Sequence, residues 1–291
     1  MQRKYAVMLV AIAALASAVF VIVYSSMFVQ TKVQTDSDNS KSTSSPKLIL
    51  QPPLGNLNIT VAQDDQRVDL VMPTFSNPTN ITNPLFPISN LHSAILLGNV
   101  EGEPFRTETT LLPDTRIIEW EGQKVETLVS QYVAFIDGRI EEVALDHYAQ
   151  ADDGSVWYFG EDVFNYEDGV VADTEGTWFA GKDGPAALIM PSKPKVGDVF
   201  RPENIPNLVF EEVTITSVDL TVDGPLGPVY GAILSKELHM DGFTEDKYFA
   251  PGYGEFSTGT EEGDLEAIAL VISRNIVNIG MLYAHLSEHQ D

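Results

Sequence analysis

Hydrophobic positions alternate with polar ones along much of the chain. Residues 213–222 read Val-Thr-Ile-Thr-Ser-Val-Asp-Leu-Thr-Val, the period-two pattern of a strand with one buried face. Similar β-rich runs occupy residues 128–145 and begin again at residue 155. No helix-period run of comparable length occurs between residues 73 and 263. We therefore expect about ten or eleven strands between Ala94 and Ile272, at the spacing typical of β-sandwiches and barrels.

Six Asp-Gly pairs separate these runs. They are Asp137-Gly138, Asp153-Gly154, Asp168-Gly169, Asp183-Gly184, Asp223-Gly224 and Asp241-Gly242. A type I′ turn needs positive φ at both central residues, which glycine adopts freely and aspartate tolerates. Each pair therefore predicts a hairpin. The predicted fold is mainly β, an antiparallel meander forming a curved sheet, a sandwich or a half-open barrel, and the pattern does not choose among these.

The amino terminus is the longest apolar stretch. Residues 5–31 carry no formal charge, and most of Tyr5–Val29 is aliphatic or aromatic. A helix needs about 20 such residues to cross a hydrocarbon layer of about 30 Å. Arg3 and Lys4 precede the run, which predicts a cytoplasmic N-terminus. We expect a single-pass cell-membrane protein with one N-terminal transmembrane helix in the lipid bilayer and the main domain outside.

A cleaved signal peptide is the alternative to this anchor. Residues Ala16-Ser17-Ala18 fit the small-x-small cleavage pattern, but the apolar run continues through Val23. The apolar region of a signal peptide is normally about 7–15 residues long, so the length favours an uncleaved anchor. Both alternatives place the rest of the chain outside the cytoplasm.

The patterns divide the chain into four segments. We expect the anchor at residues 1–30, a flexible polar tether at 31–70, an extracytoplasmic β-domain at 71–272 and a C-terminal tail at 273–291. The tether prediction rests on the serine, threonine, aspartate and asparagine residues that dominate positions 36–45. Apolar residues from Ile276 to Leu286 recur at helical spacing, which predicts a short helix in the tail.

Composition narrows the function classes. The 291 residues include no cysteine, which excludes disulfides, thiolate metal sites and cysteine nucleophiles. The net charge of -25 argues against nucleic acid as a partner, because phosphate contacts need cations. Residues 1–70 hold six basic and five acidic side chains, so the acidic excess belongs to the β-domain. We interpret it as a solvated acidic surface, and alternatively as an attraction for cations or basic partners.

Four blocks of the β-domain carry recognisable motifs. Residues 148–162 fit YAQxDDGxVWYFGED, 176–184 fit GxWxAGxDG, 189–201 fit IMPxxPxVGDxxR, and 248–255 are similar to a YAPGxG-type terminal turn. Together these blocks resemble a family of exported or membrane-anchored prokaryotic β-rich proteins. Residues 81–87 resemble its ITNPYFP segment, but residues 89–98 replace the PGTxWxYE strand that usually follows. The family is functionally uncharacterised, so the resemblance implies an exported β-domain and no particular reaction.

An aromatic and acidic block is the first candidate binding site. Trp157, Tyr158 and Trp178 could stack on a sugar or another flat ligand, with Glu161 and Asp162 accepting hydrogen bonds. Two carboxylates can also hydrolyse a glycosidic bond, although neighbouring side chains on a strand point apart. The competing interpretation is that the aromatic rings form core and the acids occupy turns.

The tail holds the candidate metal ligands. Met281, His285 and His289 recur every four residues and would share one helix face. Methionine and histidine can bind copper, and paired histidines can bind zinc. The competing interpretation is an exposed tail, because a metal site needs at least three fixed ligands. Calcium held between loops by distant acids is a further alternative in so acidic a domain.

These observations lead to a ranked hypothesis. We expect a membrane-anchored, extracytoplasmic binding or envelope-associated module that contacts a cell-envelope component or a divalent cation and has no cofactor. No Gly-x-Ser-x-Gly elbow, His-Glu-x-x-His motif or phosphate loop occurs, so no catalytic residue is assigned. The alternatives are a surface glycan hydrolase that uses acids near exposed tryptophans, and an exported metal-binding protein.

Overall fold

The structure is a computed structural model that describes residues 47–49, 58–100, 102–259 and 267–273. Strands dominate these residues, and the two helices, Asp64–Gln66 and Ile88–Asn90, are single 3-10 turns. The strands are β1 (Lys47–Ile49), β2 (Asn58–Thr60), β3 (Leu91–Val100), β4 (Glu103–Trp120), β5 (Gln123–Ile136), β6 (Arg139–Gln150), β7 (Val156–Glu167), β8 (Val170–Asp173), β9 (Trp178–Phe179), β10 (Ala187–Met190), β11 (Val199–Ile205), β12 (Val209–Gly224), β13 (Gly227–His239), β14 (Thr244–Ala250), β15 (Gly254–Gly259) and β16 (Ala267–Ser273).

Two antiparallel meanders make up one large sheet. The first runs in the order β3, β4, β5, β6, β7 and β10, and the second runs from β11 through β16. Pairing of β16 with β3 joins them, so the last strand lies beside the first strand of the sheet. The short strands β8 and β9 pair with β7. The predicted antiparallel, mainly β fold is confirmed.

Strand number differs from the prediction. The large sheet has fourteen strands among the described residues, more than the ten or eleven expected. The strands β8, β9 and β10 are only 4, 2 and 4 residues long, and such short segments carry no period-two pattern. They exist because β7 offers hydrogen-bonding partners on its free edge, which is a tertiary effect.

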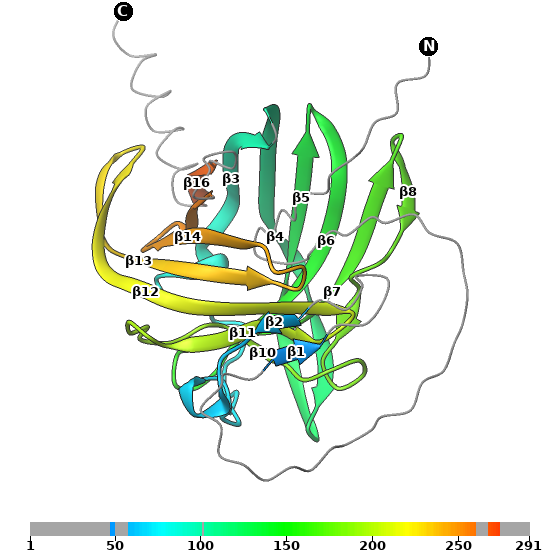
Figure 1. Ribbon diagram of the computed structural model, residues 1–291, viewed down its shortest axis with the longest axis vertical. Coiled ribbons are helices and arrows are strands. Elements are labelled where there is room, and N and C mark those ends of the chain that lie inside the picture. The colour runs from blue at the N-terminus through cyan, green and yellow to red at the C-terminus, as the bar shows by residue number, and fades with distance from the viewer. Residues whose placement is uncertain (1–46, 50–57, 101, 260–266, 274–291) are drawn as a thin grey trace, which may run out of the picture.

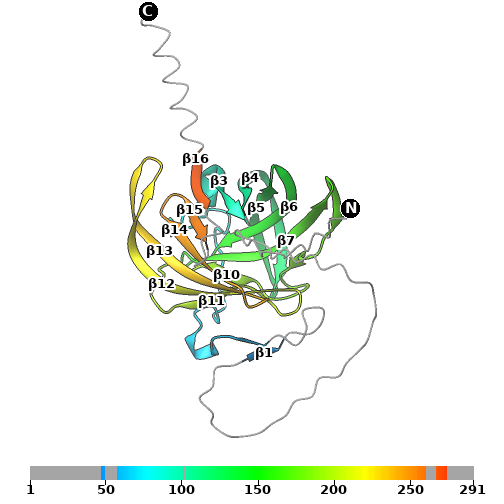
Figure 2. The same ribbon diagram turned by 45° about the horizontal axis from the view of Figure 1, so that its top comes forward.

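The two meanders share one hydrophobic core. In Figure 1 strands β12, β13 and β14 run across the view while β4 to β7 run up it, and Figure 2 shows the same arrangement from above. The largest buried cluster combines Trp120 and Trp157 of the first meander with Val213, Ile233 and Phe249 of the second. The interior between the meanders is therefore closed by side chains from both.

Asp-Gly pairs mark some hairpins and not others. Asp137-Gly138 and Asp168-Gly169 have positive φ at both residues and connect consecutive strands, as predicted. Between β12 and β13 the prediction is off by two residues, because Gly224 pairs with Gly227 and the turn lies at residues 225–226. The prediction is wrong at Asp183-Gly184, where the Asp183 carboxylate accepts a hydrogen bond from the backbone of residue 179 in a loop.

The folded domain begins earlier than expected. Residues 58–70 were expected within the flexible tether, but Ile59 and Val61 are buried against Phe210 and Met240. The backbone N–H of Ala62 donates to the Glu212 carboxylate at 2.8 Å. The boundary at residue 70 is therefore wrong. The prediction followed the polar composition of the preceding residues and overlooked Ile59 and Val61, which pack with Phe210 of β12 and Met240 of the turn after β13.

Some predicted segments lie outside the described residues. These are the anchor at 1–30 and the tail with its candidate ligands Met281, His285 and His289. Among the described residues no helix is long and apolar enough to cross a membrane.

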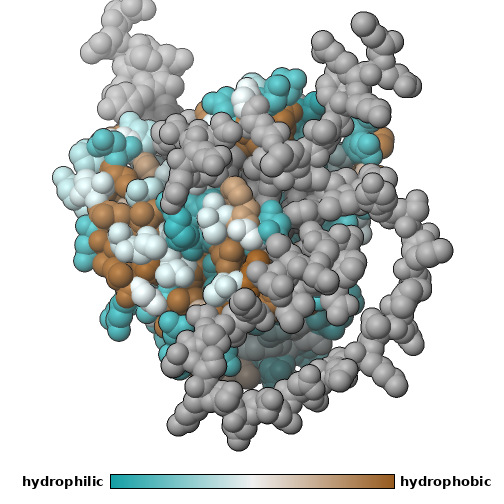
Figure 3. Space-filling model, viewed as in Figure 1, coloured by the Kyte–Doolittle hydropathy of each residue, from teal (hydrophilic) through white to brown (hydrophobic). Residues whose placement is uncertain are grey.

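The outer face carries scattered apolar residues. Figure 3 shows hydrophobic side chains gathered among polar ones over the face formed by β12 to β14. At the tip of the β12–β13 hairpin Leu226 is 87% exposed, and Tyr230 nearby is 72% exposed.

Candidate functional site

The three aromatic residues of the predicted binding site lie in the core. Trp157 is 3% exposed, and Tyr158 and Trp178 are fully buried. Tyr158 and Trp178 meet edge to face with their ring centroids 5.3 Å apart, and Trp157 packs on Trp120. Rings enclosed in this way offer no face to a sugar, so their burial supports the core interpretation.

The two acids of the same block point in opposite directions. Glu161 is fully buried, while the Asp162 carboxylate faces outward and accepts a hydrogen bond from Arg116 at 2.8 Å. Arg116 also lies over the Phe179 ring and close to His147. Burial, together with the Arg116 charge, lowers the pKa of His147 to about 4, so this imidazole is neutral. The pair therefore lacks the facing geometry of a glycoside hydrolase.

A cluster of ionisable residues fills the interior beneath β12, β13 and β14. We call Glu211, Glu237, His239, Glu245 and Lys247 the interior cluster, and all five are buried. Side chains two positions apart on a strand share a face, which places Glu237 beside His239 and Glu245 beside Lys247. The strand register then sets Glu211 opposite His239 and Glu237 opposite Glu245. All five thus project to one side of the sheet.

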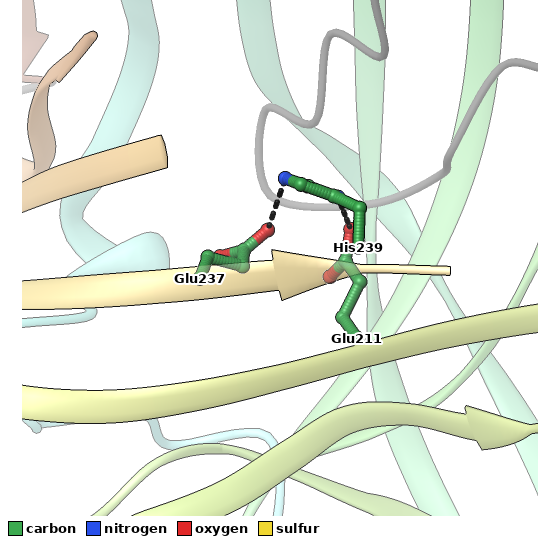
Figure 4. A group of neighbouring side chains, drawn as sticks. All are labelled: Glu211, Glu237 and His239. Atoms are coloured by element: carbon green, nitrogen blue, oxygen red, sulfur yellow. Dashed lines mark ion pairs between the residues drawn. The ribbon is translucent and has the colours of Figure 1, made fainter. Parts of the chain in front are cut away.

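His239 lies at the centre of this cluster. Its Nδ1 is 3.4 Å from Glu211 Oε1, and its Nε2 is 3.7 Å from Glu237 Oε1 and 3.4 Å from Glu245 Oε1. Figure 4 shows the side chains of Glu211, Glu237 and His239 pointing toward one another from β12 and β13. One ligand atom from each of these three lies within 4.8 Å of the others. Within the described residues, this is the group whose donors match a metal site.

Lys247 contacts two of the same carboxylate oxygens as His239. Its ammonium group donates to Glu237 Oε1 at 2.9 Å and pairs with Glu245 Oε1 at 3.1 Å. Burial alone would lower the pKa of Lys247, but the carboxylates of Glu237, Glu245 and Glu255 raise it overall. Lys247 is therefore charged in the interior.

The carboxyl groups of the cluster differ in protonation. Burial and the negative charge of Glu211 raise the pKa of Glu237 to about 8. Burial also acts to raise the pKa values of Glu211 and Glu245, but His239 and Lys247 lower both overall. Carboxylates crowded in a low-dielectric interior cannot all ionise without compensating cations, so one of the three holds a proton near neutral pH.

More carboxyl groups surround the cluster. Glu203 on β11 pairs with Glu211 in the strand register and is fully buried. Burial and the neighbouring charges of Glu211 and Glu161 raise the pKa of Glu203 well above its ordinary value. Burial likewise raises the pKa of Asp146, whose carboxylate accepts a hydrogen bond from the Tyr158 hydroxyl at 3.1 Å.

A small cavity adjoins the interior cluster. It has a volume of about 20 Å³, and its lining includes the cluster residues Glu211, Glu237 and Lys247 together with Ser235. A cavity of this size holds about one water molecule, because one water-sized probe needs about 10–15 Å³. It has room for an ion or a water and is far too small for a sugar.

Sequence reasoning missed this cluster. Residues 244–250 read Thr-Glu-Asp-Lys-Tyr-Phe-Ala, so charged side chains fall on both faces of β14. Asp246 pairs with Lys236 on the outer face, while Glu245 and Lys247 point inward. Charged residues are normally solvent-facing, and alternation does not tell which of two charged faces is buried. The useful signal was the repeat Glu-x-His and Glu-x-Lys on successive strands.

Comparison with known proteins gave no relative. No family model, curated protein or solved structure matches the chain. The resemblance of residues 148–162 to an exported family therefore stays a prediction.

Proposed function

We propose that the chain is a membrane-anchored, extracytoplasmic domain that binds a small cation in its interior. The location rests on the sequence, where an uncharged run at Tyr5–Val29 follows Arg3 and Lys4. Protease added outside wall-stripped cells should then degrade the β-domain, and full protection would contradict this orientation.

The observation that carries the binding role is the excess of buried carboxyl groups. Nine acidic residues are buried among the described residues, against one lysine and two histidines. Arg201 neutralises one of them, Glu212, at 2.9 Å. An ionised carboxylate in a low-dielectric interior is costly unless a cation or a proton compensates it. The acidic excess of this domain is thus partly an interior property, which favours cation attraction over a purely solvated surface.

A glycan hydrolase is less well supported. That role needs exposed aromatic rings and two carboxyl groups about 5–10 Å apart across a cleft. Trp157 and Trp178 are buried, and the carboxyl groups of the interior adjoin a cavity of about 20 Å³. An enclosed space of that size supports binding of an ion rather than hydrolysis of a polysaccharide.

Cation binding by the purified full chain tests the proposal. The chain is solubilised in detergent, freed of metal with a chelator and equilibrated separately with calcium, magnesium, manganese and zinc ions. We expect about one tightly bound ion per chain for at least one metal, with a rise in melting temperature, because a ligand of the folded state stabilises it. Failure of all four metals to bind would contradict the proposed function.

A further inference from the structure

Glu211, Glu237 and His239 each place one potential ligand atom, two carboxylate oxygens and one imidazole nitrogen, within 4.8 Å of the others. We propose that these three side chains ligate a single divalent transition-metal ion of the zinc class. The proposal rests on the proposed function, which requires only that the interior binds some cation, and adds the ligands and the class of metal.

Distances within the cluster separate two kinds of contact. Lys247 approaches its carboxylates at 2.9 and 3.1 Å, which are hydrogen-bonding distances. His239 stands farther off, at 3.4 Å from Glu211 and 3.7 Å from Glu237. Metal–ligand bonds of about 2.1 Å in a tetrahedron place neighbouring ligand atoms about 3.4 Å apart. The two contacts are of that length, but Glu211 lies beside Nδ1 and Glu237 beside Nε2, so an ion bound to one nitrogen must draw in the carboxylate from the other side of the ring.

Hydrogen bonding around His239 gives an independent observation. Its side chain is 1% exposed, and its ring nitrogens make ion-pair contacts of 3.4 to 3.7 Å with carboxylates but no hydrogen bond among the described residues. Buried polar groups are normally paired, so two such nitrogens aimed at carboxylates call for an explanation. A metal ion satisfies one nitrogen directly. With the ion on Nδ1 beside Glu211, the N–H at Nε2 can donate to Glu245, 3.4 Å away, as metal-bound histidines usually do. The Glu237 carboxylate, 3.7 Å from Nε2, then turns toward the ion to complete the three protein ligands.

Binding of an ion would displace a proton from the cluster. Burial alone would lower the pKa of His239, but its contacts with Glu211 and Glu245 raise it well above the ordinary value. A metal ion bound to the imidazole would therefore take the place of a proton there. The ammonium of Lys247 holds Glu237 Oε1 and Glu245 Oε1, the same oxygens that lie nearest His239 Nε2.

Ligand chemistry selects the metal. Calcium and magnesium prefer all-oxygen shells, with six to eight ligands for calcium. One imidazole nitrogen with two carboxylates is instead typical of zinc and its neighbours, which accept three protein ligands and one water. The adjoining cavity of about 20 Å³ has room for that water.

Spectroscopy on the unmodified full chain tests the ligand set without relying on a variant that folds. The metal-free protein in detergent is loaded with one equivalent of zinc and examined by X-ray absorption. We expect one histidine nitrogen, the remaining ligands oxygen, and no sulfur. Two histidines, or a sulfur ligand, would instead indicate His285, His289 and Met281 of the tail and would overturn the proposal.

Variants then locate the site. His239→Gln should weaken zinc binding about 100-fold or more and abolish the visible absorption of tetrahedral cobalt in a cobalt-loaded sample. His147→Gln is the matched control. His147 is the other buried histidine of the described residues, and its neighbour is Arg116 rather than the interior cluster. The double change His285→Gln with His289→Gln should also leave binding intact. Melting curves of each variant establish that it folds.

The outcomes separate this inference from the proposed function. Binding of calcium or magnesium without zinc leaves the cation-binding function standing and overturns the zinc-class site. Zinc binding that survives His239→Gln in a folded protein also overturns the site alone. Failure of every tested cation to bind removes both proposals.

Discussion

Single residues with special backbone requirements fix the pairing around β7. Gly160 pairs with Phe179 of β9 and has φ of +112°, a conformation that L side chains rarely adopt. A Cβ added there would overlap the backbone carbonyl of Trp178. Gly160 thus lets β9 approach closely enough for Trp178 to enter the core. The next residue, Glu161, is one of the buried acids.

Replacement of Gly160 by alanine should destabilise the domain by about 2–4 kcal/mol, because backbone strain and steric overlap add. Gly169→Ala is the matched control, since Gly169 also has positive φ but nothing within 4 Å of an added Cβ. The control lacks the overlap and should cost only about 1 kcal/mol, the strain of a left-handed backbone conformation. Urea unfolding of both variants measures the difference, and equal losses would contradict the steric argument.

At the scale of elements, β2 connects the N-terminal segment to the strands that carry the interior cluster. Ile59 packs with Phe210, which immediately precedes Glu211, and with Met240, which immediately follows His239. Glu212 accepts hydrogen bonds from Ala62 and Arg201, which fastens this segment to β12. Successive side chains of a strand point to opposite faces, so the segment predicted as a tether packs on the face of β12 opposite to the one that carries the interior cluster.

Ile59→Ala should cost about 2–4 kcal/mol, as for other large-to-small core substitutions, and should expose the chain before residue 62 to protease. Thr60→Ala, at an exposed neighbouring position, should change stability by less than about 0.5 kcal/mol. Chemical unfolding and limited proteolysis check both effects. If protease cleaved Ile59→Ala no faster than the wild-type chain, the packing of β2 would not be what holds this segment in place.

At the scale of the whole molecule, the interior balances carboxyl groups from both meanders against few cations. Lys247 is the buried lysine of the described residues and pairs with Glu237 and Glu245. Lys236 makes a comparable pair with Asp246 on the outer face, where both side chains are more than one third exposed. Substituting each lysine in turn therefore compares a buried ion pair with an exposed one between the same two strands, β13 and β14.

Lys247→Met should destabilise the metal-free domain by about 3–5 kcal/mol, because it leaves buried carboxylates uncompensated. Lys236→Met should cost about 1 kcal/mol or less. Unfolding in urea near neutral pH measures both. Equal effects of the two substitutions would contradict the idea that the interior depends on Lys247.

The same variant should respond to pH in a definite direction. The pKa of Glu237 is raised to about 8 in the folded state, above its ordinary value of 4.5, so the folded state holds an extra proton between these values. The contribution of this proton to the free energy of unfolding is present at low pH and is lost as pH rises through about 8. Lys247 lowers this pKa, so its removal should enlarge the loss at high pH. The deficit of Lys247→Met should be smaller at about pH 5 than at about pH 8, and the reverse order would exclude this mechanism.

Sequence by itself determined the antiparallel, mainly β fold and hairpins such as Asp137-Gly138, because alternation and turn conformations are local properties of a few residues. It also determined that Glu161 and Asp162 face opposite sides of one strand. Only the tertiary structure decided that Glu237 and Glu245 face inward while Asp246 faces outward, since both faces of β14 carry charge. The reason is physical. A charged side chain is placed inside by partners such as Lys247, and those partners come together only when the strands pair and the two meanders close over one core.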